Sequence, residues 1–482
     1  MRDLLFKPAL ELAAMVRAGE VSSRELVQAS LDAIDEVDGE LNAWVHVDAE
    51  NALATADAIG PDDERPFAGV PMAIKDLYCP VAGLPMTQGC DLFGDFTPEY
   101  DSALVRRFRD AGFVLMGKVN TPELGIPPVT EPRRNGATRN PWDTSRTPGG
   151  SSGGSGAAVA SGTVPVAHGS DGGGSIRIPA SCTGLLGLKP ARGRISRAPD
   201  LGDHFLATDG ALCRTTADCA ALLDVMHGYE LGDATWAPPP AEPFAEAAKR
   251  EPGKLRVAMT FDMPVEAELD PICEKATRDA AELLESLGHE VEEIRAPWAD
   301  TDLLPIFSIL WAAQVAAGVR HGQMVSGTEP AEENLEPLTW WLYQTALSQS
   351  SADLAVATPT LQGYARMIIT GIWSSHDLLL TPALGQRPVK LGTIDTMGEN
   401  PAFEFKKSGQ FTPYTATWNV TGQPAISIPL YLGDDGLPAA VQFVGPPARE
   451  DLLLQLSAQL EDALPWADRR PPARAPAGAD AG

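Results

Sequence analysis

Apolar residues spaced three and four positions apart predict helices in the first part of the chain. Residues 8–57 follow this spacing, and Ser22 with Glu25 forms a capping-box pattern at the start of one such segment. The pattern then changes, because residues 67–77 form a nearly continuous apolar run that is typical of a buried strand. Residues 102–111 predict a further helix.

The same alternation of strand-like and helix-like segments continues in the second half of the chain. Residues 255–259 and 290–294 predict strands, and residues 270–287 between them predict an amphipathic helix. A strand–helix–strand order indicates an α/β fold, with a large parallel or mixed sheet covered by helices on both faces. We expect a single domain over residues 1–466. Residues 467–482 are rich in Pro, Ala and Arg and are expected to form a disordered tail.

The charge of the chain restricts its partners. The 482 residues include 37 Lys and Arg against 65 Asp and Glu, a formal net charge of −28. Nucleic acids and anionic membrane surfaces attract basic proteins, so neither is an expected partner. A small molecule acted on by a monomer or homodimer is expected instead.

Cysteine and histidine spacing argues against disulfides and metals. The six cysteines form no C-x-x-C pair, and the seven histidines show no H-x-H or H-x-x-x-H spacing. No metal or other cofactor is therefore expected. Charged residues interrupt the first 16 residues, which do not read as a signal peptide, and no apolar run approaches the ~20 residues of a membrane span. We expect a cytoplasmic protein.

Two glycine-rich clusters, residues 149–156 and 172–174, carry the candidate chemistry. Glycine lets the backbone approach a ligand closely. The N–H groups of Gly172, Gly173 and Gly174 are therefore expected to point at one spot and form an oxyanion hole. Ser175 follows directly, which places a hydroxyl at the same spot and makes it the candidate nucleophile.

A serine needs a base to take its proton, and no histidine lies in a suitable motif. Lys75 ends the apolar run, where burial would lower its pKa and allow the neutral amine to act as a general base. Ser151 or Ser152 of the first glycine cluster could relay the proton between Ser175 and Lys75. Asp171 and Arg177 flank the second cluster and are expected to brace it.

Three segments resemble the amidase signature family. They are GGSSGG at residues 149–154, G-[TS]-D-x-GGS-[IV]-R-x-P at residues 169–179, and GLKP at residues 187–190. The resemblance implies the amidase signature fold and a Ser–cis-Ser–Lys triad made of Ser175, Ser151 and Lys75. Ser152 then has a supporting role.

The resemblance extends over nearly the whole chain, with the core signature at residues 67–194. It implies that the backbone near Gly125 and Ile126 faces the reacting carbonyl. It also implies that the variable region at about residues 300–375 walls the substrate pocket. This region is rich in Trp and Tyr, so a pocket for apolar or aryl groups is expected.

The implied activity is hydrolysis of C–N bonds in small apolar or aryl amides, linear or cyclic, through an acyl-enzyme. Residues 167–181 are similar to those of family members that hydrolyse 6-aminohexanoate cyclic dimer, aryl acylamides or carbamates. A carbamate (urethane) or ester hydrolase with the same triad remains an alternative. More distant alternatives are the amidase subunit of an amidotransferase and an α/β-hydrolase that uses the G-x-S-x-G pattern of the first cluster.

Overall fold

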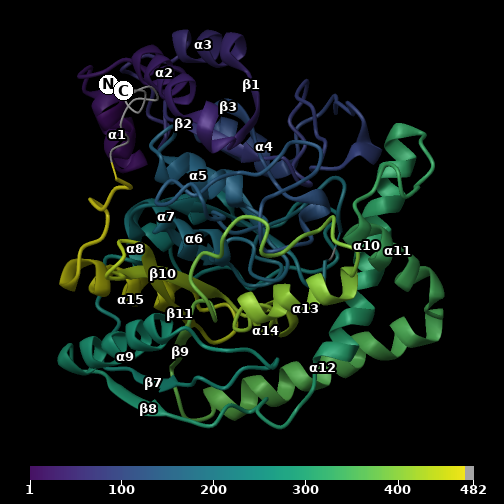
Figure 1. The fold of residues 1–482 in the computed structure, drawn as a ribbon. Helices are drawn as coiled ribbons and strands as arrows, with labels where there is room; N and C mark the ends of the chain where they lie inside the picture. The colour runs from purple at the N-terminus through teal and green to yellow at the C-terminus, as the bar shows by residue number, and fades with distance from the viewer. Residues whose placement is uncertain (203, 473–482) are drawn as a thin grey trace, which may run out of the picture.

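The computed structural model describes residues 1–202 and 204–472, and within them eleven strands form one mixed β-sheet (Figure 1). The strand order is β1-β3-β2-β4-β6-β5-β10-β11-β9-β7-β8. β2 pairs in parallel with β3 and β4, and β7 pairs in parallel with β8 and β9. The strands are β1 (Trp44–Val47), β2 (Pro71–Lys75), β3 (Val114–Val119), β4 (Val166–Asp171), β5 (Leu186–Lys189), β6 (Thr208–Cys213), β7 (Arg256–Met259), β8 (Glu290–Glu293), β9 (Leu378–Pro382), β10 (Ala425–Leu432) and β11 (Pro438–Val444).

Helices cover both faces of this sheet. The evidence is that successive residues of its strands pack into different clusters of the core. Met72 and Ile74 of β2 pack in a cluster that includes α7, whereas Ala73 packs in a cluster that includes α5. The predicted α/β fold with a mixed sheet is thus confirmed. The helices are α1 (Ala9–Arg17), α2 (Ser23–Leu41), α3 (Ala49–Asp57), α4 (Ala103–Asp110), α5 (Gly153–Ala160), α6 (Arg177–Thr183), α7 (Thr216–Met226), α8 (Phe244–Ala247), α9 (Pro271–Ser286), α10 (Leu304–Ser326), α11 (Pro337–Ser348), α12 (Ser351–Trp373), α13 (Pro401–Phe411), α14 (Thr417–Thr421) and α15 (Glu450–Ala463).

Local sequence signals explain several of these boundaries. Ser22 caps α2 as predicted, since its hydroxyl accepts from the Glu25 N–H and the Glu25 carboxylate accepts from the Ser22 N–H. The predicted strands at 255–259 and 290–294 correspond to β7 and β8, and the helix between them is α9. β1 was not predicted, because its four residues lie between two helical patterns.

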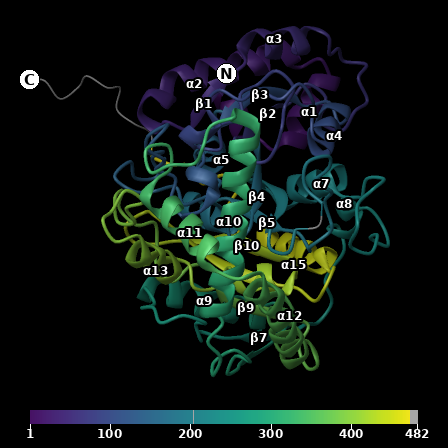
Figure 2. The ribbon, with the colours of Figure 1, turned by 90° about the vertical axis from the view of Figure 1, so that its right-hand side faces the viewer.

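The variable region folds as three helices, α10, α11 and α12, which lie along one side of the molecule (Figures 1 and 2). α10 packs against both of the other two. In the predicted tail, Arg469 donates hydrogen bonds to the carbonyl oxygens of Pro429 and Leu430. Residues 473–482 of that tail lie outside the described part of the chain.

All six cysteines are free and buried. Among the described residues, no helix combines the length and apolar character needed to cross a membrane. In the same residues, no three His, Cys, Asp or Glu side chains are grouped so that they could hold a metal ion.

Candidate active site

The two glycine clusters meet near the carboxyl end of β4. β4 ends at Asp171, and the loop Gly172–Ser175 turns from it into α6. The first cluster leads into α5, and the N–H of Ser152 donates to the carbonyl oxygen of Ser175 at 3.2 Å. This hydrogen bond joins the two loops. Ser175 is only 8 % exposed.

Lys75 is the last residue of β2, and it lies near the same place because β2 pairs with β4 and runs parallel to it. Its Nζ is 2.7 Å from Oγ of Ser151 and 3.0 Å from Oγ of Ser170. The Gly150–Ser151 peptide bond is cis. Of the two candidate relay serines, Ser151 is the one that contacts Lys75. The Ser152 hydroxyl instead donates to the carbonyl oxygen of Ser170 at 3.2 Å.

The environment of Lys75 favours its neutral form. The side chain is fully buried, and burial lowers its pKa from 10.5 to about 7, although the charges of Asp209 and Asp171 oppose the shift. A large fraction of the amine is then unprotonated near neutral pH and able to accept a proton.

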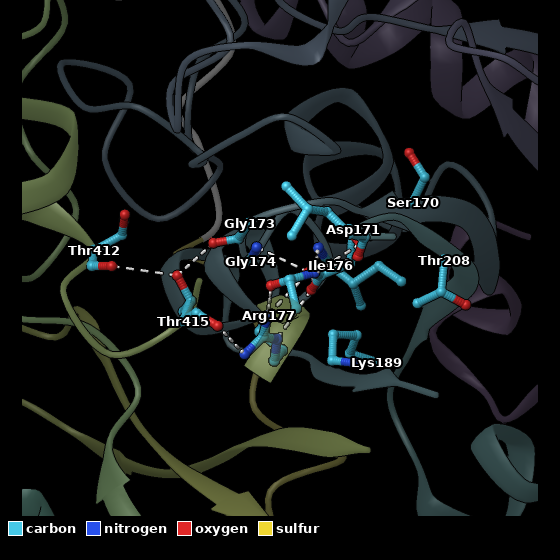
Figure 3. A network of polar contacts seen from close by, with 12 residues as sticks. Ser170, Asp171, Gly173, Gly174, Ile176, Arg177, Lys189, Thr208, Thr412 and Thr415 are labelled. Carbon is cyan, nitrogen blue, oxygen red and sulfur yellow. Dashed lines mark hydrogen bonds and ion pairs between the residues drawn. The ribbon is translucent and has the colours of Figure 1, made fainter. Parts of the chain in front are cut away.

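The side chains of Asp171 and Thr415 hold the Gly172–Ser175 loop in place (Figure 3). The N–H of Gly174 donates to Oδ1 of Asp171 at 2.8 Å, and the hydroxyl of Thr415 donates to the carbonyl oxygen of Gly173 at 2.6 Å. The Gly174 N–H is therefore occupied by Asp171 and is not free for an oxyanion. Of the three expected donors, the N–H groups of Gly172 and Gly173 remain, and the N–H of Ser175 at the end of the same loop is a further candidate donor.

Asp171 and Arg177 form a fully buried ion pair directly behind the loop (Figure 3). Nε and Nη2 of Arg177 donate to the two carboxylate oxygens at 2.9 Å each. Burial opposes the charge on Asp171, but Arg177 holds the pKa of this carboxyl well below its usual range. The remaining donors of Arg177 bond to Gln442 at 2.7 Å and Asn419 at 2.8 Å. The pair thus ties the loop to β11 and α14.

Ser175 lines two cavities. The larger, about 430 Å³, is also lined by Ser151, Ser170, Gly125 and Ile126. The smaller, about 130 Å³, has a predominantly apolar wall. That wall includes Pro127, Pro128, Ile178, Leu303, Phe307, Phe405 and Val420. Gly125 and Ile126 therefore line the same cavity as Ser151 and Ser175, and their position facing a reacting carbonyl stays a prediction.

Only part of the variable region contributes to these cavities. Within residues 300–375, the cavity-lining residues lie between 303 and 321, a stretch that covers most of α10. Trp311 of α10 lines both cavities and stacks on Phe307, with ring centroids 5.4 Å apart. Trp340 and Trp373 instead pack in hydrophobic clusters of the core. The aromatic content of the region therefore serves packing as well as the pocket.

Sequence reasoning missed Ser170 and the partners of Arg177. Ser170 was detectable, because it occupies the [TS] position of the segment at residues 169–179. Asn419, Gln442 and Thr415 lie more than 200 positions further along the chain. No local sequence pattern predicts their contact with the serine loop.

An α/β-hydrolase triad would need a histidine beside a loop serine, and His289, His321 and His376 lie downstream of the first glycine cluster. His289 bonds to Gln459 and to the N–H of Leu255, and His376 bonds to Glu292 and Ser375. His321 lines the larger cavity on α10. Within the described residues, none of the three forms a hydrogen bond to Ser151 or Ser152.

Comparison with known proteins shows the family to which the chain belongs. The family model described as Amidase matches residues 25–454, and the chain belongs to the amidase signature family of hydrolases. It is 39 % identical over 482 residues to the 6-aminohexanoate-cyclic-dimer hydrolase of Paenarthrobacter ureafaciens, covering 97 % of each chain.

Solved structures show the same fold. The structure of a 6-aminohexanoate cyclic dimer hydrolase matches with a TM-score of 0.91 at 38 % identity, covering 97 % of this chain and 99 % of that one. A bacterial aryl acylamidase of the amidase signature family matches with a TM-score of 0.85 at 26 % identity, covering 96 % and 97 %. The amidase signature fold and membership of the amidase class of hydrolases are thereby established.

Proposed function

We propose that this protein hydrolyses small apolar or aryl amides with Ser175 as nucleophile, Ser151 as proton relay and Lys75 as general base. The observation that carries the proposal is the buried contact of 2.7 Å between Nζ of Lys75 and Oγ of Ser151, on the wall of a cavity that also holds Ser175. A lysine with a pKa of about 7 in this position has the basicity that the reaction requires.

In the acylation half, Oγ of Ser175 attacks the amide carbonyl carbon. Its proton passes to Ser151 while the Ser151 proton passes to Lys75. The N–H groups of Gly172, Gly173 and Ser175 receive the negative charge that develops on the carbonyl oxygen, and each such donor contributes about 10²–10³ in rate. The C–N bond then breaks as the nitrogen takes a proton from Ser151, which Lys75 replenishes.

In the deacylation half, water enters the place that the amine has left. Lys75, neutral again, accepts the water proton through Ser151, and the hydroxide adds to the acyl carbon. The tetrahedral species collapses, the bond to Oγ of Ser175 breaks, and Ser175 regains its proton. The products are one carboxylic acid and one amine per water consumed.

The substrate class is proposed from the apolar wall of the smaller cavity and from the similarity to hydrolases named for a cyclic amide and for aryl acylamides. Carbamates and esters pass through the same kind of tetrahedral species, so they belong in the same assay. The experiment is hydrolysis of four substrates: a p-nitroanilide, a linear aliphatic amide, 6-aminohexanoate cyclic dimer and an aryl carbamate. Each is measured with the wild type and with Ser175→Ala.

Turnover of at least one amide that disappears with Ser175→Ala supports the proposal. Turnover that survives the substitution would place the nucleophile elsewhere. A clear preference for the carbamate would support the triad but overturn the proposed substrate class.

A further inference from the structure

The two cavities differ in which catalytic groups they contain. Ser175 lines both, whereas Ser151 and Ser170 line only the larger one. The leaving nitrogen must take its proton from Ser151, so the nitrogen and the group attached to it have to lie on the Ser151 side. The amine arm of the substrate therefore occupies the larger cavity, and the acyl arm is left with the smaller, apolar cavity.

The larger cavity has a cation in its wall. Arg197 lines it, and its side chain is only 7 % exposed. Its Nε donates to Oδ2 of Asp209 at 2.9 Å. Within the described residues, its two Nη groups have no hydrogen-bond partner, and Asp209 is its only ion-pair partner. Guanidinium donors that open on a cavity without a protein partner favour an anionic acceptor.

Asp209 is not the partner of Arg197 alone, because it also contacts His168. Besides Arg197, its Oδ1 lies 3.3 Å from Nε2 of His168. Burial opposes the charged form of His168, but the neighbouring Cys79 and Asp209 raise its pKa to about 9, so the imidazole is protonated near neutral pH. The carboxylate of Asp209 is thus shared between Arg197 and His168, and the Nη groups of Arg197 stay without a partner among the described residues.

Neutral donors complete the larger cavity. His204 lines it, and its Nδ1 accepts from the N–H of Ala207 at 2.9 Å, which leaves the hydrogen of the neutral ring on Nε2. Burial and Arg197 lower the pKa of His204 to about 3, so the ring is neutral. The phenol of Tyr78 also lines the cavity. Asp200 is the one acidic residue in the described lining; it is exposed and bonds to the Tyr100 hydroxyl.

We propose that the larger cavity receives the amine arm of the amide and that Arg197 binds a carboxylate on that arm. The preferred substrates are then N-acyl amino acids, in which an apolar acyl group is joined to an amine that carries a carboxylate. This inference rests on the proposed amidase function and narrows its substrate class.

Three compounds of matched size test both the charge and the direction of the amide. N-hexanoyl-4-aminobutanoate carries the carboxylate on the amine arm. N-butylhexanamide has a methyl group in its place. N-hexylsuccinamate is an isomer of the first compound with the amide reversed, so that the carboxylate lies on the acyl arm. The quantity compared is kcat/KM.

For the wild type we expect N-hexanoyl-4-aminobutanoate to exceed both other compounds by about ten- to a hundredfold, the usual contribution of a charge-assisted hydrogen bond. In Arg197→Met, the ratio of the carboxylate compound to N-butylhexanamide should fall to about one. Because each ratio is taken within one variant, any effect of the substitution on Lys75 cancels.

Arg146→Met serves as the matched control. Arg146 also donates through Nε to an aspartate, Asp143, at 3.0 Å, but it lines neither cavity. This variant should keep the wild-type ratio. A salt titration adds a second readout, since the preference for the carboxylate compound should weaken as ionic strength rises.

Equilibrium binding keeps the test decisive if turnover is slow or Arg197→Met does not fold. The Ser175→Ala protein should bind N-hexanoyl-4-aminobutanoate at least tenfold more tightly than N-butylhexanamide, as measured by calorimetry. Equal binding of the two compounds overturns the inference. Hydrolysis of N-butylhexanamide that depends on Ser175 but shows no carboxylate preference overturns it as well, while leaving the amidase function intact.

Discussion

The pH dependence of hydrolysis follows directly from the burial of Lys75. Burial lowers the pKa of Lys75 from 10.5 to about 7, which corresponds to about 5 kcal/mol in favour of the neutral amine. At pH 7 about half of the Lys75 side chains are then neutral, against about one in three thousand for an ordinary exposed lysine. The proposed base is therefore within its working range near neutral pH.

The sign of the effect is fixed by the role of Lys75. A general base works only when unprotonated, so kcat/KM should fall about tenfold for each pH unit below about pH 7 and level off above about pH 8. The assay is the initial rate on a p-nitroanilide, whose amide does not titrate, from about pH 5 to about pH 10 at constant ionic strength.

Lys75→Arg provides the control, because a guanidinium keeps its positive charge throughout this range. The variant should lose nearly all activity at every pH. A wild-type profile that is flat from about pH 5.5 to about pH 9, or that rises with an apparent pKa near 10, would refute the assignment of Lys75 as a buried neutral base.

Three further predictions concern the serine loops. Ser151→Ala should lower kcat by at least about 10³. Ser152→Ala should lower kcat by less than about tenfold, because the Ser152 hydroxyl bonds to the backbone and not to Lys75. Steady-state kinetics of both variants checks this. Gly174 has φ +130°, and an added Cβ would overlap the Thr415 side chain, so Gly174→Ala should lower kcat by about 10² or more. Gly172→Ala is the steric control, since its added Cβ meets nothing closer than 3.7 Å, and equal losses in the two variants would contradict the steric explanation. Arg177→Met should destabilise the protein by about 3–5 kcal/mol in urea unfolding, because it leaves a buried carboxylate unpaired, and an unchanged midpoint would contradict that reasoning.

Much of the fold could be predicted because local patterns agree with the final packing. The apolar run that ends at Lys75 became β2, and the capping box at Ser22 starts α2. Strand–helix–strand order was enough to indicate a mixed sheet with helices on both faces. β1 escaped because a strand of four residues, lying between two helices, has too few positions to show an alternating pattern.

The candidate site was predictable where its residues are close in sequence and less so where the fold joins distant segments. The serine loops carry a long motif, so Ser175 and Ser151 could be named. The residue types alone do not distinguish Ser151 from Ser152 as the contact of Lys75. The loop conformation is needed to show that Ser151 makes this contact. The bracing of Arg177 by Asn419 and Gln442 depends on the sheet order, which no local pattern reveals.

The two-cavity arrangement lies furthest from the sequence. The aromatic residues at 300–375 suggested a pocket, but most of them pack in the core, and within this region only residues 303–321 line the cavities. Arg197 and Asp209 carry no motif of their own. Asp209 comes near Lys75 because β4 pairs with both β2 and β6, and Arg197 is held to Asp209 by an ion pair.

The central claim is that Ser175 becomes acylated, and trapping the acyl-enzyme tests it most directly. Rapid acid quenching during turnover of a p-nitrophenyl ester or a p-nitroanilide, followed by peptide mapping with mass spectrometry, locates the acyl group. We expect the mass of one acyl group on the peptide that contains Ser175, and none in the Ser175→Ala protein. An acyl group on Ser151 or Ser152 of the wild type would contradict the proposed triad.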